Sequence, residues 1–153
     1  MLRALAILGL VFATSGTISD CDPTSIFRPT TLTLTPDPPI SGEPVYLGLI
    51  FDNTGTEVTG GTATSSVTLN GLPLSPDVKP LCEGVVCPIL SGSNNRSTES
   101  SWPSVSGKVV TKFTWTGAGG ESLLCITSTV KVLDNTTITN STDLQVYRKS
   151  LRG

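Results

Sequence analysis

The sequence predicts an all-β protein, an antiparallel sandwich of two sheets. Charged residues make up only 14% of the 153-residue chain, which holds 15 glycines and 11 prolines. This composition is typical of a β-rich domain with many turns. Beyond residue 19, short segments alternate apolar and polar residues with a period of two, and none has convincing helical periodicity.

Two alternating segments open the domain. Residues 31–35 alternate Thr and Leu and are stopped by the proline-rich segment 36–39. Residues 45–51 place apolar side chains at every second position, with Tyr46 on the other face. A turn is expected at residues 52–55, because Asn and Gly tolerate positive φ.

The next two segments form a predicted hairpin. Residues 57–69 are expected to return as one long strand, bent or bulged at its two adjacent glycines. The pair Asn70–Gly71 is a strong signal for a two-residue hairpin turn. The segment that follows, residues 72–74, contains a proline, which favours an edge position in the sheet.

Two further strands are predicted after an irregular middle. Residues 91–101 are polar and are predicted to form a loop. Residues 109–116 alternate again, and a glycine-rich turn at 117–120 leads to a last strand at residues 123–133. Six or seven short strands joined by turns predict an immunoglobulin-like antiparallel β-sandwich.

The first 19 residues have the pattern of a secretory signal peptide. Arg3 supplies a positive charge, and residues 5–13 form an apolar run that is too short to span a bilayer. Small residues follow, and cleavage is expected after Ser19, with Ser15 as the alternative site. The mature chain is therefore expected to enter the secretory pathway.

Residues 20–133 are expected to form the folded domain, and residues 134–153 a flexible, charged tail. Three Asn-X-Ser/Thr sequons begin at Asn95, Asn135 and Asn140. In a secreted chain each is a candidate glycosylation site.

Several classes of function are disfavoured by charge and composition. The chain without residues 1–19 has nine basic and twelve acidic residues, a net charge of −3, and no basic cluster, so nucleic-acid binding is not expected. There is no histidine, which excludes a Ser-His-Asp triad and histidine metal ligands. A carboxylate pair is formally available, but nothing else indicates catalysis, so no enzymatic activity, metal or cofactor is expected.

Four cysteines in a secreted chain are expected to form two disulfides. Three pairings are possible. Only four residues separate Cys82 from Cys87, a spacing that closes a small loop and leaves Cys21 to pair with Cys125. A zinc site is not expected, because the spacing matches no zinc-binding pattern.

Several motifs resemble those of one family of extracellular β-sandwiches. Residues 81–89, Leu-Cys-Glu-Gly-Val-Val-Cys-Pro-Ile, resemble the cysteine-bracketed loop of the ML (lipid-recognition) family. Residues 102–105, Trp-Pro-Ser-Val, are similar to a stretch before a strand in its sterol carriers, and residues 109–115 and 121–125 resemble their last two strands. Residues 34–39 look more like the fungal phospholipid-transfer branch.

The resemblance covers roughly residues 21–133 and implies a sandwich splayed to admit a lipid between its sheets. The sterol carriers have an extra cysteine pair for which residues 36–42 offer no counterpart, so the ligand class stays open between sterol and phospholipid. Trp102 matches an aromatic residue near the family's pocket mouth and is expected to act as a gate or wall. The other candidate wall residues are apolar residues of the predicted strands: Leu47, Leu49, Phe51, Val67, Leu69, Val109, Phe113, Trp115, Leu124, Ile126 and Val130.

The leading hypothesis is a monomeric lipid-binding or lipid-transfer protein, secreted or delivered to the endolysosomal lumen, that contacts membranes transiently. The alternative is an extracellular adhesion or receptor-accessory domain with a solid core, which binds a protein partner on an outer face. An apolar cavity between the sheets would favour the first hypothesis.

Overall fold

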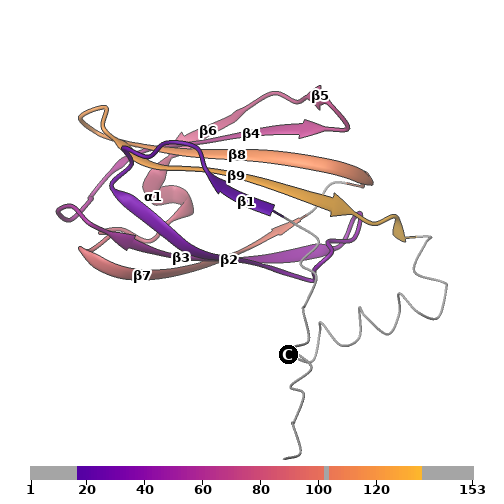
Figure 1. The fold of residues 1–153 in the computed structure, drawn as a ribbon, viewed down its shortest axis with the longest axis horizontal. Helices are drawn as coiled ribbons and strands as arrows, with labels where there is room; N and C mark the ends of the chain where they lie inside the picture. Colours follow the sequence, from indigo (N-terminus) through magenta and orange to yellow (C-terminus); the bar gives the residue numbers. More distant parts are fainter. Residues whose placement is uncertain (1–16, 102–103, 136–153) are drawn as a thin grey trace, which may run out of the picture.

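The computed structural model describes residues 17–101 and 104–135, which form two antiparallel sheets packed face to face (Figure 1). Within these ranges the larger sheet has the strand order β1-β9-β8-β4-β5, with β6 also paired to β4, and the smaller sheet has the order β2-β3-β7. The predicted all-β sandwich is confirmed. The larger sheet comprises β1 (Thr17–Asp20), β4 (Gly61–Leu69), β5 (Leu72–Pro73), β6 (Asp77–Pro80), β8 (Gly107–Gly117) and β9 (Ser122–Val132). The smaller sheet comprises β2 (Phe27–Thr35), β3 (Pro44–Asn53) and β7 (Gly92–Ser101). A short helix, α1, spans Leu81–Gly84.

Strand β3 follows the predicted alternation. Val45 and Phe51 are buried, whereas Tyr46 is 55% exposed on the opposite face. Leu49 lies directly opposite Leu32 of β2, so the two leucines share the inner face of the smaller sheet. The apolar pattern of this strand therefore sets the side that it turns toward the larger sheet.

The predicted hairpin turn after β4 is confirmed. Asn70 and Gly71 have φ angles of 49° and 87°, the left-handed conformation that such two-residue turns require. The Asn70 side chain also accepts a hydrogen bond of 2.8 Å from the backbone N–H of Lys108 at the start of β8. The turn is thus anchored to the neighbouring strand as well as shaped by its own residues.

Residues 91–101 do not form the predicted loop, and this prediction was wrong. Residues 92–101 form β7, which pairs with β3 over ten consecutive positions. Because β7 is an edge strand with polar residues on both faces, it lacks the hydrophobic alternation that reveals a half-buried strand. Its backbone hydrogen bonds to β3, rather than its side chains, specify it as a strand.

Three smaller features also differ from the expectation. Strand β4 begins at Gly61, and Val58 instead forms a separate bridge with Ile89. Strand β6 and helix α1 were not predicted. Each contains only four residues, fewer than a reliable pattern of either period needs.

The main core lies between the sheets at one end of the sandwich. Phe27 and Phe51 are fully buried, with ring centroids 4.9 Å apart. Trp115 of β8 packs edge-on against both rings, at 6.2 and 5.9 Å. A second, smaller cluster is centred on Val109 and Val130. These two clusters hold the facing sheets together.

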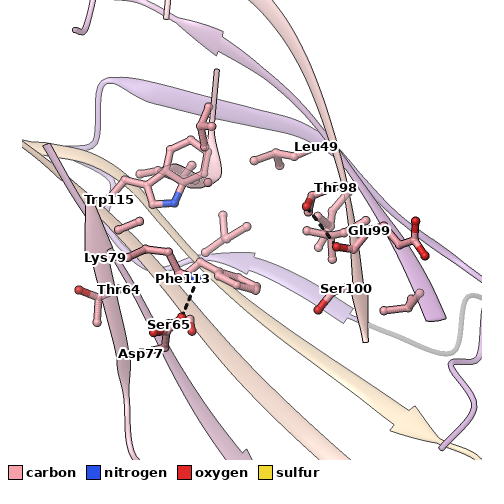
Figure 2. A pocket seen from close by; sticks show the side chains of 18 residues that line it. Leu49, Thr64, Ser65, Asp77, Lys79, Thr98, Glu99, Ser100, Phe113 and Trp115 are labelled. Carbon is pink, nitrogen blue, oxygen red and sulfur yellow. Dashed lines mark hydrogen bonds and ion pairs between the residues drawn. The ribbon is translucent and has the colours of Figure 1, made fainter. Parts of the chain in front are cut away.

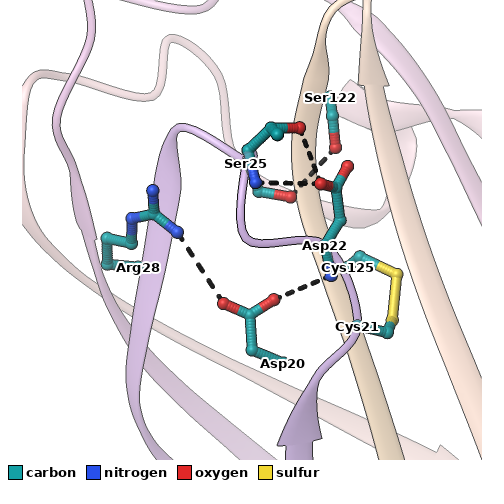
Figure 3. Close-up of a disulfide and its surroundings, with 8 residues drawn as sticks. Asp20, Cys21, Asp22, Ser25, Arg28, Ser122 and Cys125 are labelled. Carbon is teal, nitrogen blue, oxygen red and sulfur yellow. Dashed lines mark hydrogen bonds and ion pairs between the residues drawn. A yellow bond between two sulfur atoms is a disulfide. The ribbon is translucent and has the colours of Figure 1, made fainter.

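One long side of the sandwich is closed by the N-terminal segment (Figure 3). Strand β1 pairs with β9, and the disulfide between Cys21 and Cys125, with Cα atoms 5.1 Å apart, fastens that junction. Asp20 pairs with Arg28 of β2 at 3.8 Å, which adds a contact to the smaller sheet. The second disulfide, Cys82–Cys87, closes the loop that contains α1.

The position of β1 bears on the two cleavage sites considered above. Cleavage after Ser15 would keep the whole strand, whereas cleavage after Ser19 would leave only Asp20 of it. The signal peptide itself remains a prediction, since residues 1–16 lie outside the described residues. So do residues 136–153, which make up most of the predicted tail.

Asp22 is expected to make stability depend on acidic pH. Hydrogen bonds from the side chains of Ser122 and Thr24 lower the pKa of Asp22 from 3.8 to about 2. A lowered folded-state pKa stabilises the fold above pH 3.8, and this contribution is lost as the pH falls toward 2. Asp22→Asn should therefore be less stable than the wild type near neutral pH, and the gap should narrow on acidification. Urea denaturation at a series of pH values measures it; a gap that stays constant would contradict the assignment.

Candidate functional site

A cavity of about 390 Å³ lies between the two sheets. We call it the inter-sheet slot. Its walls come from both sheets and from the end of α1, so it occupies the space where the sandwich is not filled by side chains. The lining residues are Leu32, Val45, Leu47, Leu49, Ala63, Thr64, Ser65, Asp77, Lys79, Gly84, Val85, Thr98, Glu99, Ser100, Phe113, Trp115, Leu124 and Ile126.

The deep part of the slot is apolar. On the larger sheet, Trp115 lies opposite Leu124 in the strand register and Phe113 lies opposite Ile126, so all four side chains share the inner face. Leu49 faces them from the smaller sheet (Figure 2). Trp115 also packs against the aromatic core, so it joins that core to the slot wall.

The mouth of the slot lies between two edge strands, β6 and β7. Asp77 and Lys79 of β6 lie opposite Ser65 and Ala63 of β4, on the inner face of the larger sheet. Thr98 and Ser100 of β7 face them across the opening (Figure 2). All four residues at the mouth are exposed. The slot therefore changes from apolar to polar as it reaches solvent.

The only two charges that line the inner face of β6 are paired. The Lys79 ammonium lies 2.9 Å from a carboxylate oxygen of Asp77, and each side chain is about half exposed. The hydrogen bond and the charge of Asp77 raise the pKa of Lys79. The lip formed by β6 consequently presents a neutralised ion pair rather than a free cation.

One end of the slot region is closed by the segment that contains α1. Leu81 of α1 and Ile89 are fully buried, and the Val58–Ile89 bridge ties this segment to the residues just before β4. Gly84 and Val85, within the Cys82–Cys87 loop, form part of the slot wall. The disulfide loop is thus a structural element of the site.

The inner face of β7 is polar, a feature that the sequence analysis missed. Asn94 lies opposite Phe51 and is buried, with its amide nitrogen donating to the carbonyls of Leu90 and Gly92. Arg96 lies opposite Leu49, and its buried Nε has no hydrogen-bond partner among the described residues. Inward-pointing polar groups on an edge strand discourage pairing with other chains.

The predicted wall residues divide into those that line the slot, some of which also belong to the main core, and those that do not. Six line the slot: Leu47, Leu49, Phe113, Trp115, Leu124 and Ile126. Phe51 belongs to the main core, and Val67, Leu69, Val109 and Val130 belong to the second cluster. Val130 also lines a smaller hollow of about 190 Å³. Trp102 lies outside the described residues, so its role as gate or wall remains a prediction.

Two of the predicted glycosylation sites can be placed. Asn95 is exposed on β7, and Asn135 is exposed just after β9. Asn140 lies outside the described residues. Within residues 17–101 and 104–135, no group of three His, Cys, Asp or Glu side chains could hold a metal ion. The same part of the chain contains no helix long and apolar enough to span a membrane.

Comparison with solved structures identifies similar sandwiches. A Niemann-Pick type C2 protein from the Japanese carpenter ant has a TM-score of 0.59 and 15% identity, covering 76% of this chain and 99% of that one. Chicken MD-1 complexed with lipid IVa has a TM-score of 0.55 and 12% identity, covering 76% of this chain and 88% of that one. At such low identity these similarities establish the fold alone.

No curated protein matches the sequence. The ML-domain family model, however, matches residues 15–132, most of the chain. The two disulfides and this match indicate a protein of the secretory pathway. The two-sheet sandwich, the slot between its sheets and the family match lead to one conclusion: the chain belongs to the ML-domain family, whose members recognise lipids.

Proposed function

We propose that this protein binds a sterol or phospholipid in the inter-sheet slot and transfers it between membranes. The observation that carries the proposal is the slot itself, about 390 Å³ with an apolar floor and a polar mouth. This volume lies in the usual range of ligand sites, roughly 300–1,000 Å³. An apolar cavity has no reason to hold water, and a lipid that enters it removes hydrocarbon surface from water.

The arrangement favours an amphipathic ligand bound with its polar end outward. Phe113 and Trp115 offer apolar surface to a ring system or acyl chain, whereas Thr98 and Ser100 offer hydroxyl groups at the mouth. The Asp77–Lys79 pair adds little net charge there. A ligand with a hydroxyl or zwitterionic polar group suits the residues at the slot mouth better than one with several negative charges.

The remaining parts of the proposal concern context. The protein acts as a monomer in an extracellular or endolysosomal lumen, where its disulfides are stable. It binds and releases lipid without chemical change and uses no catalytic residues. It carries glycans at Asn95 and Asn135, both of which are exposed.

Extraction of the purified, secreted protein with organic solvent, followed by mass spectrometry, tests the proposal. We expect a stoichiometric co-purified sterol or phospholipid. The lipid-free protein should then take up a fluorescent sterol or a fluorescent phosphatidylcholine and deliver it to acceptor vesicles. Absence of both co-purified lipid and uptake would favour the adhesion hypothesis instead.

A further inference from the structure

Large apolar side chains that remain exposed are concentrated beside the slot. Of seven such residues in the described part of the chain, five lie in the segment 72–90, and they are 48–74% exposed. The same segment contributes Asp77, Lys79, Gly84 and Val85 to the slot lining. We call these five residues the apolar rim: Leu72, Leu74, Val78, Val86 and Leu90.

The rim follows the edge of the larger sheet that borders the mouth. Strands β5 and β6 run along this edge (Figure 1). Leu72 lies opposite Leu69, whose side chain packs on the second core cluster, so Leu72 is on the inner face of its sheet. It is nevertheless 71% exposed, because no described residue of the smaller sheet covers it. Val86 is 74% exposed inside the disulfide loop, next to Val85 of the slot wall.

Single exposed apolar residues need no explanation, but five of them within one segment that also lines a cavity mark an interaction surface. Val78 alternates with the inward-facing Asp77 and Lys79 and therefore lies on the outer face of β6, so the apolar rim passes around the edge of the sheet beside the slot. A lipid that leaves the slot must pass this edge. The bilayer that donates or accepts the lipid is therefore the surface expected to contact the apolar rim. Contact between rim and bilayer would spare the lipid a passage through water.

The charges of the segment indicate how it would bind. Residues 72–90 contain Asp77, Lys79 and Glu83, a net charge of −1, and Lys79 is already paired with Asp77. Anionic lipids attract clusters of basic residues, and the rim has none. Its attraction to a membrane must come from the apolar side chains.

We propose that the apolar rim inserts into the interfacial layer of a lipid bilayer, with the slot mouth facing the membrane, and that this docking requires no anionic lipid. The inference rests on the proposed function, because the argument for a bilayer depends on lipid passing through the mouth. It goes further by naming the docking surface and the source of its affinity.

Flotation of the full-length protein with vesicles tests the inference. The wild type should bind vesicles of phosphatidylcholine alone as well as vesicles of phosphatidylcholine mixed with phosphatidylserine, with little dependence on salt. The double variant Leu72→Asp/Val86→Asp should bind both at least about tenfold more weakly, because two apolar side chains no longer enter the bilayer. Thr31→Asp, a change at an exposed residue on the edge strand β2 of the smaller sheet, is the control and should bind like the wild type.

Three results would overturn the inference. The double variant could bind as well as the wild type, or the wild type could bind only phosphatidylserine vesicles and dissociate in salt. The double variant could also change a dimer to a monomer in size-exclusion chromatography, which would make a second copy the occupant of the rim. Lipid extraction from the same samples separates this inference from the proposed function. Absence of lipid in the wild type counts against the proposed function, whereas the flotation result alone tests whether the apolar rim binds a membrane.

Discussion

Ser65→Trp is expected to abolish lipid binding while leaving the fold intact. Ser65 lies on the inner face of β4, lines the slot and sits opposite Phe113 of β8. An indole at this position would occupy the slot from its wall. A cavity of about 150 Å³ is enough for benzene, so the larger indole should take a substantial share of the 390 Å³ present.

The fold should tolerate the change because tryptophan suits a strand and can form a cross-strand aromatic pair with Phe113. We expect co-purified lipid to fall at least about tenfold, which corresponds to about 1.4 kcal/mol of lost binding energy. The melting temperature should shift by only a few degrees, roughly the effect of 1 kcal/mol or less. Mass spectrometry of extracted lipid and a thermal melt are the two measurements.

Ser66→Trp provides the matched control. Ser66 is the next residue on the same strand, is exposed on the outer face and pairs with Lys112. The same substitution there leaves the slot open, so lipid content should match that of the wild type. If both variants lost lipid equally, or if Ser65→Trp kept it, the slot would not be the binding site.

The sequence predicts which residues are buried, but not which of the buried residues line the slot. Strand β3 illustrates both points. Leu49 and Phe51 are two residues apart, are both nearly fully buried and follow the same alternation. Both belong to the main core, but Leu49 also lines the slot, whereas Phe51 packs against Phe27 and does not reach the slot. Alternation records only which face of a strand is turned inward. Whether that face meets the opposite sheet or a gap depends on how far the sheets are splayed, and no residue in the strand encodes this alone.

Strand β7 marks the other limit. Its residues are polar on the inner face as well as the outer, from Asn94 to Ser100, and they read as a loop. Because the short strand β6 was also missed, neither strand that borders the slot mouth was predicted from the sequence pattern. By contrast, β8 and β9 were predicted because both strands are central and bury one apolar face each. Edge strands that border a site have the weakest alternation of apolar and polar residues, although they shape its opening.

Removal of the disulfide between Cys21 and Cys125 is expected to lower the free energy of unfolding more than removal of the Cys82–Cys87 disulfide. The bridge joins residues 104 apart in sequence. In the chain-entropy model a loop of this length contributes about 4–5 kcal/mol, a large part of the 5–15 kcal/mol typical of a domain. The variant Cys21→Ala/Cys125→Ala should lose about that much in urea denaturation. The Cys82–Cys87 bridge spans only five residues, and the same relation gives about 2 kcal/mol for Cys82→Ala/Cys87→Ala.

Loss of the Cys82–Cys87 bridge should affect lipid release more than loss of the Cys21–Cys125 bridge, although it should cost less stability. Cys21–Cys125 fastens β1 to β9 on the closed side of the sandwich, away from the mouth. Cys82–Cys87 encloses Gly84 and Val85, which form part of the slot wall. At a temperature where both variants remain folded, the Cys82→Ala/Cys87→Ala protein should release a fluorescent lipid faster than Cys21→Ala/Cys125→Ala, despite its greater stability. Equal release rates, or rates that simply follow stability, would show that the disulfide loop does not hold the wall of the slot in place.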